Sequence, residues 1–258
     1  MAMNSFDHSL SIMPETLAVR GGKIVAYGET AAVLEVTGGD SIKIQRQLWT
    51  LKAKLDQHKQ MMHKPRRNKQ PTLLDVVLGN NNITVIFDPL LCSFPTTAPL
   101  LKALWEECCS RDISKNAQHG EIKHHKIKAY FGGDFGPDLT NLAKQSSITP
   151  MNFVESYCQQ EYLVMFLGFQ PGFAYLHGLT KQLHSTRMAE PRTKVPIGSI
   201  AIGGSQTGIY PSASPGGWQI IGRVDASHLP LFDFKNNPPN LFQAGDRISF
   251  SPKNMRDL

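Results

Sequence analysis

Apolar residues in the first 111 positions recur at helical spacing in two stretches, and β-rich stretches precede and separate these two. Over residues 41–62 an apolar residue appears every three to four positions, which predicts an amphipathic helix. The residues that carry this spacing are Ile44, Leu48, Leu51 and Leu55. Residues 23–37 are rich in β-branched side chains and are broken by Gly28, which predicts two strands or one bent strand.

Two further apolar runs, residues 73–78 and 83–87, flank the turn sequence Gly-Asn-Asn-Asn and are predicted to be a pair of strands. Residues 100–109 again show helical spacing. The resulting order of strand, helix, strand, strand and helix is typical of a ferredoxin-like α+β domain. We therefore assign residues 1–111 to such a domain.

The pattern changes after a polar stretch, residues 112–123, which has no periodic apolar positions and is predicted to be a linker. The second domain, residues 124–258, begins with two predicted helices, 139–145 and 151–160. Thr149 would cap the second helix, with Pro150 at its first position. From Tyr162 onward, short β-rich pieces alternate with Gly and Pro, which predicts a β-barrel or a sandwich.

Composition agrees with a globular cytoplasmic protein. The chain has 258 residues, of which 41% are hydrophobic and 19% charged, enough for a sizeable core. Its four cysteines form no CxxC pair and no regular framework, so a disulfide-built secreted protein is not expected. The N-terminus lacks the pattern of a signal peptide, and the most apolar run, residues 162–169, is far shorter than the about 20 residues that a membrane span needs. We expect no membrane partner.

The formal charge of +6 raises the question of a nucleic-acid partner. Five basic residues are concentrated between Lys59 and Lys69, in a stretch that favours a solvated loop over a site for an acidic partner or a phosphate. No aromatic residues alternate with these charges, as they do where bases are stacked. We expect no nucleic-acid partner.

Closely spaced glycines and prolines mark four segments of the second domain: residues 132–139, 166–176, 195–211 and 214–223. Such backbone either forms tight barrel turns or lies close to a ligand, where its N–H groups can bind an anionic or carbonyl oxygen. Gln206 and Thr207 would add side-chain hydrogen bonds, and Tyr210 and Trp218 would form either an apolar wall or part of the core. The candidate substrate-binding residues are Asp134, Phe169, Gln170, Pro171, Gly172, Phe173, Gly204, Gln206, Thr207, Tyr210, Ser214, Gly216, Gly217 and Trp218.

No familiar catalytic motif is present, and the catalytic residues stay unassigned. The sequence GGSQTG lacks the Lys-Ser/Thr ending of a phosphate-binding loop and the pattern of a serine nucleophile. His124 and His125 are adjacent on a predicted strand and would face opposite ways, so no metal site is expected there. Cys108 and Cys109 lie on a helical pattern, where core packing is the better interpretation.

The same segments resemble the B-type component of 5-oxoprolinase, a family also called the KipI or allophanate-hydrolase-subunit-1 family. GGDFGPDL, EYLVMFLGFQPGFAYLHGL, the run from Glu190 to Arg223 and AGDRISFSP occur in that family's order. The resemblance is close over residues 127–252. It implies a ferredoxin-like N-terminal domain followed by a cyclophilin-like β-barrel domain.

The resemblance also implies a function that depends on partners. The family's B-type component acts with an A-type (LamB/YcsF-like) and a C-type (allophanate hydrolase subunit 2-like) component in the ATP-dependent opening of 5-oxoproline to glutamate. ATP would be used by the complex, and the chain alone would be inactive. Two alternatives are a regulator that inhibits a sensor histidine kinase and one half of a biotin-dependent urea or allophanate-type carboxyltransferase. The second alternative requires a separate biotin carrier, because no biotin-attachment motif is visible here.

Overall fold

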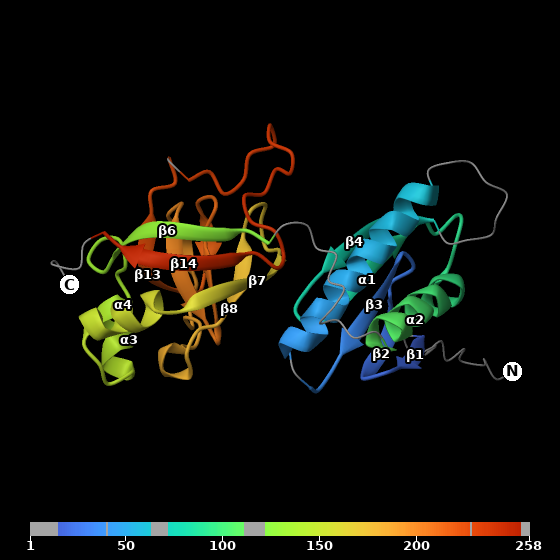
Figure 1. Cartoon of the computed structure of the whole chain (residues 1–258), viewed down its shortest axis with the longest axis horizontal. Coiled ribbons are helices and arrows are strands. Elements are labelled where there is room, and N and C mark those ends of the chain that lie inside the picture. Colours follow the sequence, from blue (N-terminus) through green and yellow to red (C-terminus); the bar gives the residue numbers. More distant parts are fainter. Residues whose placement is uncertain (1–14, 40, 63–71, 111–121, 228, 254–258) are drawn as a thin grey trace, which may run out of the picture. The chain divides into compact units, whose positions relative to one another are not determined.

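The computed structural model describes residues 15–39, 41–62, 72–110, 122–227 and 229–253. The chain divides into two compact units, Met1–Ala117 and Gln118–Leu258 (Figure 1). Most of the basic stretch 59–69 and of the predicted linker 112–123 lies outside the described residues. The domain limits drawn from the sequence therefore stay predictions.

In the described part of the first unit, five antiparallel strands form one sheet in the order β1-β2-β3-β5-β4. Two helices contact each other and pack on one face of this sheet (Figure 1). The chain runs from β3 through α1 to β4, and β5 lies between these two strands, which is the split β-α-β arrangement of ferredoxin-like domains. The elements are β1 (Thr16–Val19), β2 (Gly22–Tyr27), β3 (Ala31–Val36), α1 (Ser41–Met62), β4 (Leu73–Leu78), β5 (Asn82–Phe87) and α2 (Phe94–Ser110).

The apolar positions that predicted α1 form the core of this unit. Leu48, Leu51 and Leu55 are each no more than 1% exposed. Full burial of one such side chain contributes about 1.5–3 kcal/mol. From α2, the Trp105 indole N–H donates a 2.8 Å hydrogen bond to the Arg20 carbonyl and ties the helix to the turn between β1 and β2.

The second unit is a closed barrel, in which the described strands follow the order β10-β11-β8-β7-β14-β6-β13. All neighbouring pairs are antiparallel except β14 and β6, which are parallel. A separate two-stranded ribbon is formed by β9 and β12. The elements are β6 (His124–Phe131), α3 (Leu139–Gln145), α4 (Pro150–Cys158), β7 (Glu161–Leu167), β8 (Ala174–His177), the 3₁₀ turn η1 (Lys181–Leu183), β9 (Arg192–Val195), β10 (Ser199–Gly203), β11 (Gln206–Ile209), β12 (Ser214–Gly216), β13 (Gln219–Val224) and β14 (Arg247–Pro252).

Alternate strand residues fill the barrel interior, and α4 adds large side chains to the same core. Phe153 and Tyr157 of α4 are fully buried in one cluster with Phe131 of β6 and Phe250 of β14. The Thr149 hydroxyl accepts a 3.1 Å hydrogen bond from the Asn152 N–H, and Pro150 opens the helix, as predicted. The helix therefore starts at its cap and directs its apolar face into the barrel.

Strand β10 is buried at all of its positions, unlike the other barrel strands. Ile200 and Ile202 belong to the interior core, whereas Ala201 belongs to a second apolar cluster on the outer side of the barrel. Both faces of this strand are therefore covered, which removes the alternation of buried and exposed residues.

The α+β class with a ferredoxin-like unit followed by a β-barrel is confirmed. Two details differ from the prediction. Strand β1 was not predicted, since Thr16–Val19 is short and only half buried. Helix α2 starts at Phe94 rather than at residue 100, so Pro99, just before the predicted start, lies within the helix. Among the described residues, no helix is long and apolar enough to cross a membrane.

Candidate functional site

Three of the four glycine-rich segments, residues 166–176, 195–211 and 214–223, meet in the outer apolar cluster, which we call the outer aromatic cluster. Phe173 is at its centre, with its ring centroid 5.3 Å from that of Tyr210, 5.5 Å from that of Trp218 and 5.0 Å from that of Tyr175. The rings meet edge to face, the arrangement that aromatic quadrupoles favour. Phe173, Tyr210 and Trp218 are almost fully buried, so the cluster is an apolar layer outside β10.

Several glycines are required by the close approach of these rings. A Cβ on Gly203 would lie 2.5 Å from the Trp218 indole, and one on Gly208 would lie 2.8 Å from the Phe173 ring. A Cβ on Gly216 would lie 2.4 Å from the Tyr210 hydroxyl oxygen. These glycines therefore serve aromatic packing.

The loop that contains Phe169 to Phe173 forms the exposed edge of the cluster. Phe169 is 60% exposed and has a left-handed backbone, with φ of 67°, which is uncommon for a residue other than glycine. Its ring contacts those of Phe173 and Tyr210 at centroid distances of 5.5 and 6.1 Å. Next to it, Gln170 Oε1 accepts a 2.9 Å hydrogen bond from the Ser212 hydroxyl. These contacts hold an exposed aromatic ring in a strained conformation.

Two arginines accompany the cluster. The Arg187 guanidinium lies 5.8 Å from the Trp218 ring centroid, within the range of a cation–π contact. Arg192 of β9 donates a 2.6 Å bond to Asp138, whose other carboxylate oxygen accepts 2.6 Å from the Ile220 N–H of β13. The Asp138 carboxylate thus ties the outer ribbon to the barrel wall.

Burial changes the acidity of two phenols in this layer. Desolvation raises the pKa of Tyr175, an effect that the nearby Arg187 charge opposes. Desolvation also raises the pKa of Tyr210, opposed by a hydrogen bond with the backbone of Trp218. Both phenols are therefore protonated at neutral pH.

The barrel places Gln206 and Thr207 on different sides of β11. The Thr207 hydroxyl is fully buried inside the barrel, where it donates 2.9 Å to the Ala201 carbonyl and lies 2.8 Å from the Tyr157 hydroxyl. Its hydrogen-bonding capacity is used by the core, so it has no access to a ligand. Gln206 is half buried at the end of the β10–β11 hairpin, which turns through Gly204 with φ of 68°.

The remaining candidates divide between the cluster and other places. Asp134 is exposed, and its carbonyl oxygen lies 3.4 Å from the Arg223 guanidinium, away from the ring contacts of the cluster. The Ser214 hydroxyl is buried and has no hydrogen-bond partner among the described residues. The candidates that lie in the cluster, in the loops that border it or in strand β12 are Phe169, Gln170, Pro171, Gly172, Phe173, Tyr210, Gly216, Gly217 and Trp218.

Sequence reasoning missed three residues of this region: Asp138, Arg187 and Arg192. Of the two aspartates in the segment GGDFGPDL, Asp134 was predicted to bind and Asp138 was not. Only the fold brings Asp138 to Arg192, 54 positions away. Within the described residues, no group of three or more His, Cys, Asp or Glu side chains could hold a metal ion. Chemically, this face offers aromatic edges, an amide and two guanidinium groups, which suit recognition of another surface or of a small polar ligand.

A family model and individual relatives point to the same protein family. The family model "Carboxyltransferase domain, subdomain C and D" matches residues 22–242. The B-type component of 5-oxoprolinase from Haemophilus influenzae is 39% identical over 227 residues, which are 88% of this chain and 96% of that protein. This chain belongs to the B-type 5-oxoprolinase family. The family's member from Escherichia coli O157:H7 is 38% identical and covers 88% of this chain and 94% of its own length.

Solved structures share the architecture of the family. TTHA0988 is 26% identical with a TM-score of 0.66, and the match covers 87% of this chain but only 40% of that longer chain. The K. lactis urea amidolyase is 18% identical with a TM-score of 0.67, and the match covers 92% of this chain and 15% of that one. At this identity, the similarity to the K. lactis urea amidolyase shows a shared fold only. The predicted family resemblance is confirmed.

Proposed function

We propose that this chain is the B-type component of a multi-subunit 5-oxoprolinase, in which water opens the lactam C–N bond of 5-oxoproline to give glutamate. The observation that carries this proposal is the 39% identity to the B-type 5-oxoprolinase component of Haemophilus influenzae over 96% of that protein's length. Because this relative is one subunit of an enzyme, we infer that this chain also needs partner proteins. We infer that these are an A-type and a C-type protein, that the complex uses ATP and works in the cytoplasm, and that this chain alone is inactive.

The exposed edge of the outer aromatic cluster supports contact with a partner. Phe169 is 60% exposed, and Phe232, which is 38% exposed, lies close to Gly172 of the same loop. Exposed aromatic rings on a rigid frame are typical of protein interfaces. The strained backbone at Phe169 costs stability, which is consistent with a position kept for binding.

The experiment is reconstitution with the A-type and C-type proteins of the same organism. Glutamate release from 5-oxoproline is measured with ATP, without ATP, and with each protein left out in turn. We expect ATP-dependent release only when all three proteins are present. Release by this chain alone, or by the other two proteins without it, would contradict the proposal.

The match to a carboxyltransferase family model also favours a second function, that of a carboxyltransferase component. This function would require a biotinylated carrier, whereas lactam opening would not. Adding avidin to the reconstituted complex separates the two, because avidin sequesters biotin. We expect glutamate release to be unaffected; inhibition by avidin would favour carboxyl transfer.

Within the complex we propose that Gln206, from the edge of the cluster, hydrogen-bonds the substrate. Loss of one charge-assisted hydrogen bond costs about 1.5–3 kcal/mol, so Gln206→Ala should slow glutamate release by about ten- to a hundredfold. The melting temperature should hardly change, since Gln206 is only half buried. If the variant unfolds more easily but keeps normal activity per folded molecule, Gln206 is structural and this assignment is wrong.

A further inference from the structure

Strand β6 has an open edge over its first half. Its pairing with β14 extends from His124 to Ala129, whereas β13 pairs with it only from Ala129 to Phe131 and ends at Val224. The carbonyls of Lys123 and Ala129 accept hydrogen bonds from the β14 side. Because backbone groups alternate in direction along a strand, the N–H groups of Lys126 and Lys128 point to the side where β13 has ended.

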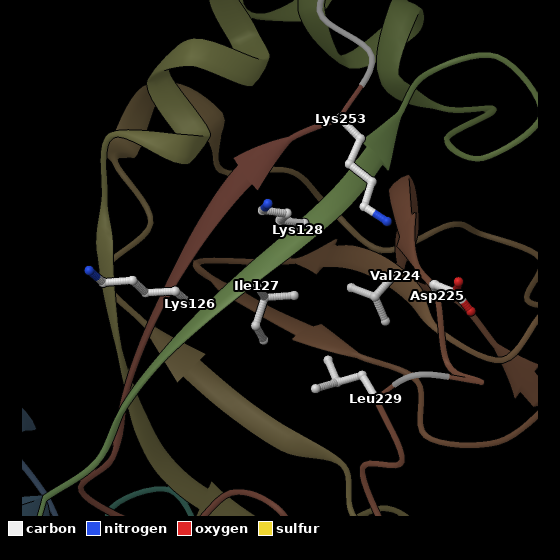
Figure 2. Close-up of a pocket in the computed structure, with 7 residues that line it drawn as sticks. All are labelled: Lys126, Ile127, Lys128, Val224, Asp225, Leu229 and Lys253. Carbon is white, nitrogen blue, oxygen red and sulfur yellow. The ribbon is translucent and has the colours of Figure 1, made fainter.

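A pocket occupies this open side. Its volume is about 410 Å³, within the range of small-molecule sites. Four charged and three apolar side chains line it: Lys126, Lys128, Lys253, Asp225, Ile127, Val224 and Leu229. In Figure 2, Lys253 reaches from beyond the end of β14 across β6 toward Val224 and Asp225, while Lys126 extends to the other side of β6. We call this site the lysine pocket.

The lysine pocket has an excess of positive charge. Because Lys126 extends to the other side of β6, the ammoniums that count here are those of Lys128 and Lys253, and against Asp225 they leave one positive charge. The ion pairs shown among the described residues of this unit do not include Lys128 or Lys253. The Lys253 ammonium lies over the Tyr130 ring, 5.1 Å from its centroid, which holds the ammonium in place without cancelling its charge.

The Asp225 carboxylate accepts hydrogen bonds from a residue of the same turn. It accepts hydrogen bonds of 2.6 Å from the Ser227 hydroxyl and 3.2 Å from the Ser227 N–H. The N–H groups of Lys126 and Lys128 and the ammoniums of Lys128 and Lys253 are thus the donors of the pocket, and they favour an anion. The carbonyls of Lys126 and Lys128 also point to this open edge and would accept hydrogen bonds from water or from a protonated group of the ligand. The apolar side chains of Ile127, Val224 and Leu229 line the rest of the pocket and would contact a nonpolar part of the ligand.

We propose that the lysine pocket binds a small organic anion, with its phosphate or carboxylate groups on Lys128, Lys253 and the open edge of β6. These ligands share more than one negatively charged oxygen group. Pyrophosphate represents the phosphate compounds and glutarate the dicarboxylates. This proposal does not depend on the 5-oxoprolinase function, because it uses residues of the barrel face at β6 and can be tested without turnover.

The test is calorimetric titration of the full chain with pyrophosphate and, separately, with glutarate at low salt. We expect saturable binding of at least one anion that weakens as salt is raised. Lys128→Ser and Lys253→Ser should each weaken it about tenfold or more, the effect of one lost charge-assisted bond. The matched control is Lys144→Ser on α3, an exposed lysine outside the pocket, which should leave binding unchanged.

The variant Asp225→Asn should change anion affinity in the opposite direction to the lysine variants. It keeps an oxygen that can accept from Ser227 but removes the only negative charge of the described pocket lining, so anion binding should tighten severalfold. A merely structural role for Asp225 would not predict tighter binding. Absence of saturable binding, equal loss in the Lys144 control, or weaker binding in Asp225→Asn would overturn the proposal. Lysine variants that weaken assembly of the complex while leaving anion titration unchanged would instead indicate a surface for an acidic partner protein.

Discussion

Strands β10 and β6 belong to the same barrel, but their outer faces are used in different ways. Outside β10, rings and glycines pack so closely that every residue of the strand is buried. Outside β6, Lys126 and Lys128 are exposed, and half of one strand edge has no partner strand among the described residues. The first face is closed by packing, whereas the second keeps charge and backbone donors available.

Segments with an unusual sequence pattern are therefore not always the segments whose groups are free to bind a ligand. The Gly/Pro-rich segments look like ligand-binding backbone, yet at Gly203 and Gly208 the missing Cβ makes room for a ring. The residues of the lysine pocket, by contrast, lie in an ordinary strand pattern. Single substitutions on each face can test this difference between a packed surface and an open one.

The largest effect is expected for Trp218→Ala. Trp218 is 6% exposed and packs against Phe173 and Tyr175, so truncation should lower the free energy of unfolding by about 3–5 kcal/mol. Lys126→Ala on the other face should change it by less than about 0.5 kcal/mol. Urea unfolding of the full chain measures both. Similar losses in the two variants would contradict the contrast between the faces.

A smaller loss is expected for Gly203→Ala. The new Cβ would lie 2.5 Å from the rigid indole of Trp218, and overpacking of this kind costs about 1–3 kcal/mol. Gly204→Ala meets no atom within 4 Å but has φ of 68°, which costs a side chain about 1–2 kcal/mol.

The two glycine effects are separated by repeating each change in the Trp218→Ala background. The cost at Gly203 should largely disappear there, because the clashing ring is gone, while the cost at Gly204 should stay. If the Gly203 cost persists without the indole, backbone conformation rather than ring packing requires that glycine.

Helical periodicity and capping residues made much of the fold predictable from the sequence. α1 was predicted with its observed limits, because its apolar residues follow one face and the helix ends are local features. The start of α4 was equally local, set by Thr149 and Pro150. β1 could not be found in this way, since a four-residue strand at the edge of a sheet has no fully buried position.

The candidate site was harder to predict than the fold, because it depends on which way each strand faces. Gln206 and Thr207 are adjacent and were given the same role, yet the strand turns one of them into the core. β10 is buried on both faces and therefore shows no alternation that would reveal the inner side. The contact between Asp138 and Arg192 depends on tertiary structure alone.

A moderate effect is expected for Thr207→Val, which keeps the shape of the side chain but removes its hydroxyl. The Ala201 carbonyl would lose a donor and the buried Tyr157 hydroxyl its partner, which should cost about 1–3 kcal/mol of stability. Thermal unfolding measures the loss. A control is Tyr157→Phe in the same background, which removes the stranded hydroxyl and should recover part of it. No recovery would mean that the Tyr157 hydroxyl is satisfied in another way.

The smallest effect, and one of opposite sign, is expected for Ser214→Ala. The Ser214 hydroxyl is buried without a hydrogen-bond partner among the described residues, unlike that of Thr207. A buried polar group without a partner is destabilising, so its removal should leave the melting temperature unchanged or raise it slightly. Because the outer face of β10 is closed, no lost ligand contact should offset this gain. A fall in the melting temperature comparable with that of Thr207→Val would instead show that a bound water or ligand satisfies Ser214, and that the packed face is more open than its aromatic layer suggests.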